Sequence, residues 1–312
     1  MNTALKSGKF GKQYTSSNHR IIVTGAAGFL GYHLIEALSE ARCDVTAIVR
    51  PKSEHNKRLF RFKELHCIEA DEDEIERIQD TLLADNGCFI HLLWRPAGRY
   101  DYEAQMENAY LTLKAVELAS RIGCKRFIGI GSQAEYGLTG EEMIEDKTPA
   151  KPFCAYGAAK TAACHMSKRR ARELGMEWIW GRVFSVYGEY EPEERIIPSV
   201  MKALERGDGL ALSSCRQNWD FLYGGDAGSA ILALAEKGRD GEIYNIAEGE
   251  YRPLKSFVED VEGLYGARNY FKFGDDPCPF VSLQPSVEKL RRDAGWEPHV
   301  RFVDGIKALM KM

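Results

Sequence analysis

The stretch Thr24–Gly31, which reads TGAAGFLG, decides the fold of this chain. It follows a short β-branched run (RIIVT) and leads into Phe29–Glu40, where apolar residues recur at helical spacing. Gly25 permits a tight turn, Gly28 lets the backbone approach a pyrophosphate, and Gly31 lets the helix pack close to the strand. Phosphates would lie at the helix N-terminus, where unpaired N–H groups point at them. The stretch therefore predicts a dinucleotide-binding turn rather than a glycine-rich turn of purely structural use.

From residue 20 to residue 187, apolar runs of strand length alternate with amphipathic stretches of helix length. The predicted strands are Arg20–Thr24, Asp44–Arg50, His66–Ala70, Cys88–Leu93, Arg126–Gly131 and Glu177–Val183. The predicted helices between them are Phe29–Glu40, Asp71–Ala84, Tyr102–Ile122 and Ala155–Leu174. This alternation predicts an α/β fold, a Rossmann-type doubly wound parallel sheet with helices on both faces.

The alternation breaks after Tyr187, so we expect two lobes. The larger, dinucleotide-binding lobe covers residues 20–187 and part of 220–246, and residues 1–19 are interpreted as a flexible leader. A smaller C-terminal substrate lobe comes from residues 188–219 and 247–312. The elements predicted in this later part of the chain are helices Ser199–Arg206, Asp226–Lys237 and Phe302–Met310, and strands Trp219–Tyr223 and Glu242–Ile246.

Composition excludes several classes of protein. The 312 residues are 44% hydrophobic and 28% charged, a balance that excludes disorder over most of the chain. The net charge of −4 does not favour nucleic acid as a partner, and no apolar run reaches the ~18 residues of a membrane helix. The eight cysteines form no CxxC motif. No group of His, Cys and Asp residues has metal-ligand spacing. Cys67, Cys88 and Cys164 lie in apolar runs, where we expect them to be buried. Scattered cysteines and a polar N-terminal stretch without a signal predict a reducing, cytoplasmic location.

The end of the second predicted strand bears on the choice of cofactor. An NAD site of this type has an acidic residue there, which binds the ribose hydroxyls. This chain has Arg50 instead, followed by Lys52, Lys57 and Arg58. Because a guanidinium suits a 2′-phosphate, the sequence favours NADP over NAD. The alternative interpretation is that Arg50 is a solvent-facing loop residue.

A second motif carries the predicted chemistry. Tyr156 and Lys160 belong to YGAAK in a predicted helix, and a spacing of four residues puts both side chains on one helix face. A nearby ammonium favours the phenolate and lowers the tyrosine pKa from its usual ~10. Ser132 ends the fifth predicted strand, where sheets of this kind bind their ligands. Together the three side chains predict a site that holds a substrate oxygen and transfers its proton.

In these features the chain resembles the extended short-chain dehydrogenase/reductases, the group of nucleotide-sugar epimerases, dehydratases and ketoreductases. The resemblance runs from residue 20 nearly to the C-terminus. The segments that carry it are TGAAGFLG at 24–31, Asp71, HLLW at 91–94, Asn108, GSQAEYG at 131–137, YGAAK at 156–160, RVFSVYG at 182–188, WDFLYGGD at 219–226, YNIAEG at 244–249 and GWEP at 295–298. By these ordered matches the chain is identified as a member of the family.

The resemblance implies roles for individual residues. The residues implied to cradle the cofactor pyrophosphate are Gly25, Gly28, Phe29, Leu30 and Gly31. Further cofactor contacts are implied for Asp71 near the adenine, Leu92 and Leu93 at the ribose, Val183 beside the nicotinamide and Lys160 at the nicotinamide ribose. Ser132 and Tyr156 would bind the reacting oxygen, and the remaining implied substrate contacts are Gln133 and Ser185. The resemblance also implies a homodimer in which the two helices 102–122 and 155–174 of each copy form a four-helix bundle.

Three departures from the family pattern narrow the predicted function. The dehydratases of the family carry Thr-Asp-Glu where residues 132–134 read SQA, and neither Gln nor Ala supplies the acid/base pair that removal of water requires. The family arginine that helps hold the substrate diphosphate is replaced by Trp219, and Arg216 is the nearest basic residue to take over a substrate contact. Leu93 and Trp94 replace two small alanines, which would narrow the site near the nicotinamide.

Some residues near these motifs have a structural interpretation. His91 ends a predicted buried strand, and we expect a hydrogen-bonded core histidine rather than a base. Trp178 and Trp180 alternate within a strand and are expected in the core. Glu135 fits a substrate contact and a turn residue equally well.

The sequence thus predicts NAD(P)-dependent redox chemistry on a sugar nucleotide. The first interpretation is reduction of a 4-keto sugar, in which NADPH delivers hydride to the carbonyl carbon, Tyr156 gives the proton and Ser132 polarises the oxygen. The alternative is a 4-epimerase that oxidises and re-reduces the sugar with tightly held NAD. A third hypothesis, a cofactor-binding sensor without turnover, is disfavoured because Ser132, Tyr156 and Lys160 are all intact.

Overall fold

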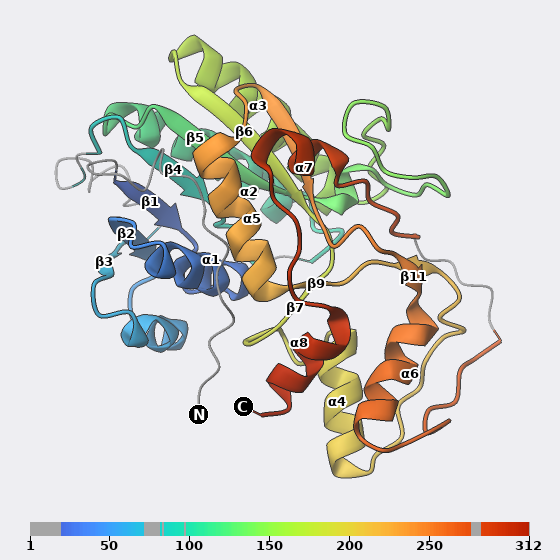
Figure 1. Ribbon diagram of the computed structural model, residues 1–312. Coiled ribbons are helices and arrows are strands. Elements are labelled where there is room, and N and C mark those ends of the chain that lie inside the picture. The colour runs from blue at the N-terminus through green and yellow to red at the C-terminus, as the bar shows by residue number, and fades with distance from the viewer. Residues whose placement is uncertain (1–19, 72–81, 83, 97, 276–281, 312) are drawn as a thin grey trace.

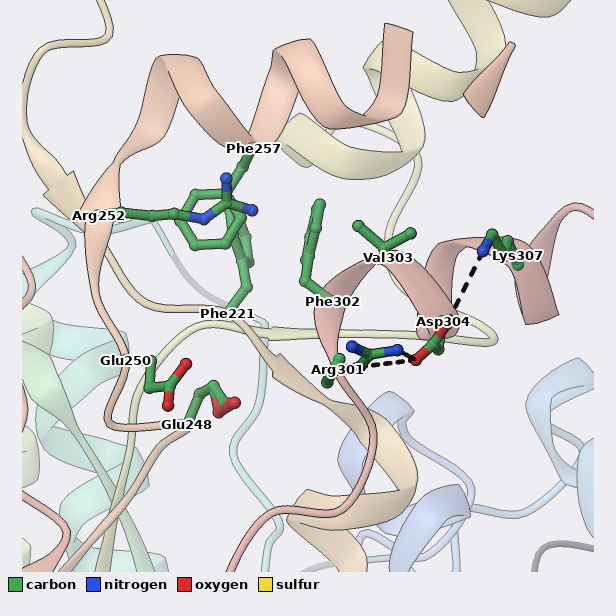
Figure 2. Close-up of a pocket in the computed structure, with 10 residues that line it drawn as sticks. All are labelled: Phe221, Glu248, Glu250, Arg252, Phe257, Arg301, Phe302, Val303, Asp304 and Lys307. Atoms are coloured by element: carbon green, nitrogen blue, oxygen red, sulfur yellow. Dashed lines mark hydrogen bonds and ion pairs between the residues drawn. The ribbon is translucent and has the colours of Figure 1, made fainter. Parts of the chain in front are cut away.

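A seven-stranded parallel sheet forms the centre of the computed structural model, which describes residues 20–71, 82, 84–96, 98–275 and 282–311 (Figure 1). Its strands are β1 (Ile21–Thr24), β2 (Val45–Val49), β3 (His66–Glu69), β4 (Cys88–His91), β5 (Arg126–Ser132), β6 (Glu177–Val183) and β10 (Glu242–Ile246). They lie in the order β10-β6-β5-β4-β1-β2-β3, and each neighbouring pair is parallel. The predicted doubly wound α/β fold is therefore confirmed. The strand order reverses between β1 and β4, and ligands of such sheets bind beyond the carboxyl ends of the strands at that point.

Helices cover both faces of the sheet. On one face lie α1 (Phe29–Glu40) and α5 (Gly224–Lys237), and on the other lie α2 (Tyr102–Arg121) and α3 (Ala155–Glu173) (Figure 1). Side chains of β1 alternate between these two cores, because Ile21 and Val23 pack with α1 whereas Ile22 packs with α2 and α3. The continuous apolar strands of the sequence follow from burial on both faces. Trp178 and Trp180 of β6 are buried as expected and stack on each other.

A third hydrophobic cluster lies apart from the sheet. It is formed by α4 (Ile196–Arg206), α6 (Leu254–Leu264) and α8 (Phe302–Leu309), together with buried aromatic rings of the segments beside them. Two small sheets accompany it, one pairing β7 (Val186–Tyr187) with β9 (Leu222–Tyr223) and one pairing β8 (Asn218–Trp219) with β11 (Arg252–Pro253). The remaining elements are α7 (Glu288–Ala294) and the 3-10 turns η1 (Glu54–Arg61) and η3 (Gln133–Glu135).

The division into two lobes stays a prediction. The third cluster is where the smaller lobe would have its core. However, Leu290 and Ala294 of α7 pack into the core of α1 and α5. A boundary drawn by packing would therefore place α7 with the larger lobe.

Several predicted elements need correction. The predicted strand Trp219–Tyr223 is two short strands of different sheets, separated at Asp220, whose buried carboxylate accepts from the backbone N–H groups of Glu248 and Gly249. Helix α4 begins at Ile196 rather than at Ser199, so it includes Pro198 in its first turn. A proline is tolerated there because the backbone N–H groups of the first turn have no partner within the helix. Cys67 is exposed on the edge strand β3, whereas Cys88 and Cys164 are buried.

Two of the predicted segments lie wholly or mostly among residues that the structure does not describe. The flexible leader 1–19 and most of the predicted helix Asp71–Ala84 lie outside the described residues. Among the residues that are described, no helix is long and apolar enough to cross a membrane.

Candidate active site

The glycine-rich turn between β1 and α1, which we call the phosphate cradle after its predicted role, is tightly packed. Gly25 has a φ of +74°, and a Cβ there would stand 2.8 Å from the backbone nitrogen of Leu93. A Cβ on Gly31 would collide with the carbonyl oxygen of Gly25. Gly28 is the N-cap of α1, no side chain caps the helix and its first turn holds no acidic residue. The first N–H groups of α1 therefore face an approaching anion without a competing carboxylate.

Next to this turn, a cavity of about 520 Å³ collects the predicted reactive side chains. Ser132 enters it from the end of β5, while Tyr156 and Lys160 enter it from the first turns of α3. The predicted site residues that line the cavity are Phe29, Leu30, Leu92, Ser132, Gln133, Tyr156, Lys160, Val183 and Ser185. The cavity thus borders the phosphate cradle through Phe29 and Leu30 and also contains the predicted acid.

The phenol of Tyr156 is kept neutral by its surroundings. Burial raises its pKa above the usual value, although the Ser132 side chain and the charge of Arg195 act in the opposite direction. The backbone N–H of Tyr156 donates to the carbonyl oxygen of Arg99 at 3.1 Å, which ties the start of α3 to the loop after β4. In this state Tyr156 is equipped to give a proton rather than to take one.

Lys160 is buried between the sheet and an indole ring. Its Nζ donates to the carbonyl oxygen of Ile130 at 2.8 Å and lies 3.7 Å from the centre of the Trp94 ring. Burial lowers the pKa of Lys160 to about 7, and the charge of Glu135 opposes this effect only in part. The Trp94 ring also meets Tyr156 edge to face at 6.0 Å between centroids. Trp94 therefore forms part of the cavity wall beside Lys160 and Tyr156, and the narrowing near the nicotinamide stays a prediction.

The loop after β4 is held by two buried amides of α2. Nε1 of Trp94 donates to Oε1 of Gln105 at 2.9 Å. Asn108 accepts from the backbone N–H of Arg95 at 2.7 Å and donates to its carbonyl oxygen at 3.1 Å. These bonds fix the position of the indole over Lys160.

Glu135 is a structural residue rather than a substrate contact. It is fully buried in η3, and its Oε1 accepts from the backbone N–H of Ser132 and from Nε1 of Trp180, each at 2.9 Å. Its Oε2 accepts from Nε of Arg182 at 2.8 Å. This answers the question that the sequence left open, because both carboxylate oxygens are occupied in holding β5, β6 and the turn that carries Ser132.

His91 is a buried core histidine, as expected. Its Nδ1 lies 2.8 Å from the hydroxyl oxygen of Thr24, which links the ends of β4 and β1. Burial, reinforced by the charge of Lys160, lowers the pKa of His91 to about 3. The ring is therefore neutral at physiological pH.

Besides the three glycines of the turn, four predicted site residues do not line the cavity. Leu93 packs against Gly25 of the cradle. Arg50 and Asp71 are exposed just beyond the ends of β2 and β3, at the same edge of the sheet as the cradle. Arg216 is exposed ahead of β8 and does not line the cavity. Their predicted contacts with cofactor and substrate stay predictions.

Three arginines to which the sequence motifs assigned no site role lie in the site region. Arg99 and Arg195 line the cavity, one from the loop before α2 and the other from the residue before α4. Arg58 donates to the carbonyl oxygen of Ala27 in the glycine-rich turn at 3.3 Å and stacks over the Tyr190 ring at 4.5 Å. The basic run after the second strand pointed to Arg58, but no local signal marked the other two.

Comparisons with known proteins agree with this architecture. Residues 21–247 match the model of the family described as "NAD dependent epimerase/dehydratase family". A mouse (Mus musculus) dTDP-D-glucose 4,6-dehydratase is 25% identical, and the alignment covers 92% of this chain and 86% of the relative. A UDP-glucuronic acid 4-epimerase from Bacillus cereus, solved with UDP-glucuronic acid and NAD, superposes with a TM-score of 0.80 at 24% identity, covering 93% of this chain and 97% of the other. A dTDP-glucose 4,6-dehydratase from Streptomyces venezuelae, solved with NAD, gives a TM-score of 0.80 at 20% identity, with 94% and 96% covered.

Proposed function

Because the chain belongs to the NAD dependent epimerase/dehydratase family, we propose that it is an NAD(P)-dependent oxidoreductase that acts on a nucleotide sugar, in the first place by reducing a 4-keto sugar. The observation that carries this proposal is the single cavity that holds Ser132, Tyr156 and Lys160 and borders the glycine-rich turn. The relatives that act on nucleotide sugars, by their names, support the substrate class.

The residues present fit a nicotinamide dinucleotide. Gly25 and Gly31 leave no room for a Cβ against the neighbouring backbone of Leu93 and of the turn itself, so this turn packs tightly at the start of α1. The open N-terminus of α1 favours the charge of a pyrophosphate. Phe29 and Leu30 connect this cradle to the cavity of Tyr156. Such a cofactor, when bound, supplies the hydride.

The chain itself supplies the proton and holds the reacting oxygen. The neutral phenol of Tyr156 gives its proton to the oxygen of the sugar carbonyl while the carbonyl carbon gains a hydride. Ser132, which lines the same cavity and lowers the pKa of Tyr156, would hold the same oxygen. Lys160 is placed one helical turn further on, where its partial charge at neutral pH stabilises the phenolate that remains.

The cavity speaks against elimination of water. Where the family's dehydratases carry Asp and Glu, Gln133 and Ala134 line the cavity, and no described residue of the lining is a carboxylic acid. Glu135, the neighbouring carboxylate, is bound on both oxygens by Ser132, Trp180 and Arg182. The site therefore lacks the acid/base pair of a dehydratase and retains the groups for carbonyl redox chemistry.

We propose NADPH as the reductant, with Arg50 as its 2′-phosphate contact. We expect Arg50→Asp to weaken NADPH binding about 10-fold or more, since a charge-assisted hydrogen bond contributes ~1.5–3 kcal/mol, and to leave NADH binding nearly unchanged. Fluorescence titration with both reduced cofactors measures the two effects. An equal loss for both cofactors, or none for either, contradicts the assignment.

The second candidate function is 4-epimerisation of a nucleotide sugar with retained NAD. It is favoured by the structural similarity to a UDP-glucuronic acid 4-epimerase that was solved with NAD. Ser132, Tyr156 and Lys160 would serve this reaction too. An epimerase removes a hydride from the sugar carbon and a proton from its hydroxyl, and then returns both.

One experiment separates the two functions. We would denature the purified protein and identify the released cofactor by mass spectrometry, then supply a 4-keto sugar nucleotide with NADPH and follow absorbance at the reduced nicotinamide band. A reductase releases little cofactor and consumes NADPH in proportion to product. Stoichiometric NAD in the purified protein, with interconversion of two sugar nucleotides and no net use of NADPH, supports the epimerase instead.

A further inference from the structure

Two guanidinium groups stand on the wall of the reaction cavity. Arg99 belongs to the loop between β4 and α2, and Arg195 immediately precedes α4, so the two approach the cavity from different parts of the fold. Both side chains are exposed. Among the described residues neither forms an ion pair with a carboxylate. The reaction cavity therefore carries two positive charges that its own lining does not neutralise.

The backbone fixes where each arginine lies. The carbonyl oxygen of Arg99 accepts from the N–H of Tyr156, and its guanidinium rests over the Phe153 ring at 5.1 Å. The carbonyl oxygen of Arg195 accepts from the N–H of Ser199 at 2.9 Å in the first turn of α4. The charge of Arg195 lowers the pKa of the Tyr156 phenol, against the larger effect of burial. The backbone of each arginine is thus held in place, and both residues lie on the wall of the cavity that contains the predicted acid.

The one nearby acid does not cancel this charge. Glu191 lies close enough to Arg195 to respond to its charge, but burial raises the pKa of Glu191 to about 8. Glu191 lines a different hollow, beside α4, and not the reaction cavity. At neutral pH it is mostly protonated, so the positive charge of Arg195 remains.

The position at which the family carries a diphosphate-binding arginine is unsuited to that task here. Trp219 occupies it, packs against two hydrophobic clusters and does not line the cavity. Its Nε1 is buried without a hydrogen-bond partner among the described residues. An anionic substrate entering this site would therefore meet an indole where an arginine is expected, and two other arginines at the wall of the cavity.

We propose that Arg99 and Arg195 form an anion clamp that binds negatively charged oxygens of the substrate and sets its position against Tyr156. The planar guanidinium fork matches a phosphate or a carboxylate. The anion comes from the diphosphate of the nucleotide or from a carboxylate on the sugar. This inference rests on the proposed function, because it names what that same site selects.

Calorimetric titration of the full-length protein tests the clamp. The probes are UDP, UDP-glucose and UDP-glucuronic acid, each added to the wild type and to Arg99→Gln, Arg195→Gln and the double variant in the presence of saturating cofactor. If the clamp binds the diphosphate, each single variant loses about 10- to 100-fold in affinity for all three probes. If it binds a sugar carboxylate, the loss is confined to UDP-glucuronic acid. In either case the wild-type affinity falls as salt is raised.

Controls separate the clamp from folding and from rival sites. Arg172→Gln removes the same charge from an exposed position on α3 far along the helix, and it should bind every probe as the wild type does. Thermal melting and cofactor titration show whether each variant is folded and whether cofactor binding is spared. A loss in Arg216→Gln, with none in the two clamp variants, would assign the contact to Arg216.

The outcomes also show whether a failure concerns the anion clamp alone or the proposed function as well. Wild-type binding that persists at full strength in the double variant overturns the clamp and leaves the proposed function standing. A fall in cofactor affinity, with probe affinity unchanged, overturns the clamp because the arginines then serve the cofactor. Failure of the wild type to bind any of the three probes overturns the clamp for these ligands, and the proposed function falls with it only if no 4-keto sugar nucleotide is turned over in the NADPH assay above.

Discussion

Tyr156 is the side chain on which the proposed chemistry depends most directly. Its hydroxyl is the only part of the ring that takes part in proton transfer, because the ring itself packs edge to face on Trp94. We expect Tyr156→Phe to lower the rate of hydride transfer by 10²–10⁴-fold while leaving cofactor affinity nearly intact. Stopped-flow absorbance and fluorescence titration with NADPH measure the two quantities.

Two companion variants sharpen this prediction. Ser132→Ala should reduce the rate with little effect on cofactor binding, whereas Lys160→Ala should reduce both. Retention by Tyr156→Phe of more than about a tenth of the wild-type rate, against the 10²–10⁴-fold expected, would rule out the phenol as the acid.

Lys160 should also make the stability of the protein depend on pH. Burial lowers its pKa in the folded state to about 7 from the ordinary value of 10.5. Between these two values the unfolded chain binds a proton that the folded chain does not, so this group makes the free energy of unfolding rise with pH by up to about 1.4 kcal/mol per pH unit. Urea unfolding of the wild type and of Lys160→Met from pH 7 to pH 10 checks this. The free energy of unfolding of the wild type minus that of the variant should rise with pH. Parallel curves would contradict a lowered pKa for Lys160 in the folded protein.

At this scale the sequence predicts motif residues well and isolated residues poorly. Ser132, Tyr156 and Lys160 were recognisable because their spacing and place at strand and helix ends carry the chemistry, and the structure brings them into one cavity. Arg99 and Arg195 carry no such spacing. Their place depends on how the loop after β4 and the start of α4 fold against the sheet, which is a property of tertiary packing.

At the scale of elements, the buried pair of Glu135 and Arg182 joins η3 to β6. Its bonds at 2.8–2.9 Å also fix the backbone of Ser132 at the end of β5. We expect Glu135→Gln to lower the free energy of unfolding by about 3–5 kcal/mol, because it leaves the Arg182 charge buried without a partner. Urea denaturation measures the loss.

A surface pair and a double variant serve as controls for this prediction. Glu173→Gln breaks an exposed ion pair with Arg169 on α3 and should change stability little. Glu135→Leu combined with Arg182→Met removes both charges and should recover part of the loss. A Glu135→Gln variant as stable as the wild type would show that the pair contributes nothing.

Most strands of the sheet were predictable to within one or two residues, because continuous apolar runs mark them. The region from Asn218 to Tyr223 was not, since its alternating residues fit one strand as well as two. What separates the two strands is the buried Asp220, whose partners come from Glu248 and Gly249, nearly thirty residues later. A local pattern contains no information on such a contact.

At the scale of the whole molecule, α2 and α3 present an apolar outer face. Tyr102, Met106 and Tyr110 of α2 are spaced four residues apart and exposed, as is Met166 of α3. On α3, Ala159 and Ala163 are buried against the sheet, whereas Ala158 is exposed and Ala162 is half-buried. We therefore keep the homodimer as a prediction, with these two helices packing on those of a second copy.

The variant Met106→Glu combined with Met166→Glu tests this assembly. We expect the wild type to have the mass of a dimer by light scattering at micromolar concentration and the variant to have the mass of a monomer, because charges placed in an apolar interface are not solvated. Met310→Glu, which changes another exposed methionine outside α2 and α3, should leave the mass unchanged. A wild-type monomer would refute the prediction.

The packing of α1 against α5 has a consequence for how the chain is made. The inner face of α1, with Leu34 and Leu38 fully buried, forms one core with α5, which is synthesised much later. At about 5–20 residues per second, a ribosome needs roughly 10–40 s for the roughly 200 residues between the two helices. For that time the growing polypeptide carries an uncovered apolar helix next to its phosphate-binding turn. We therefore expect chaperones to bind the nascent chain before α5 is made.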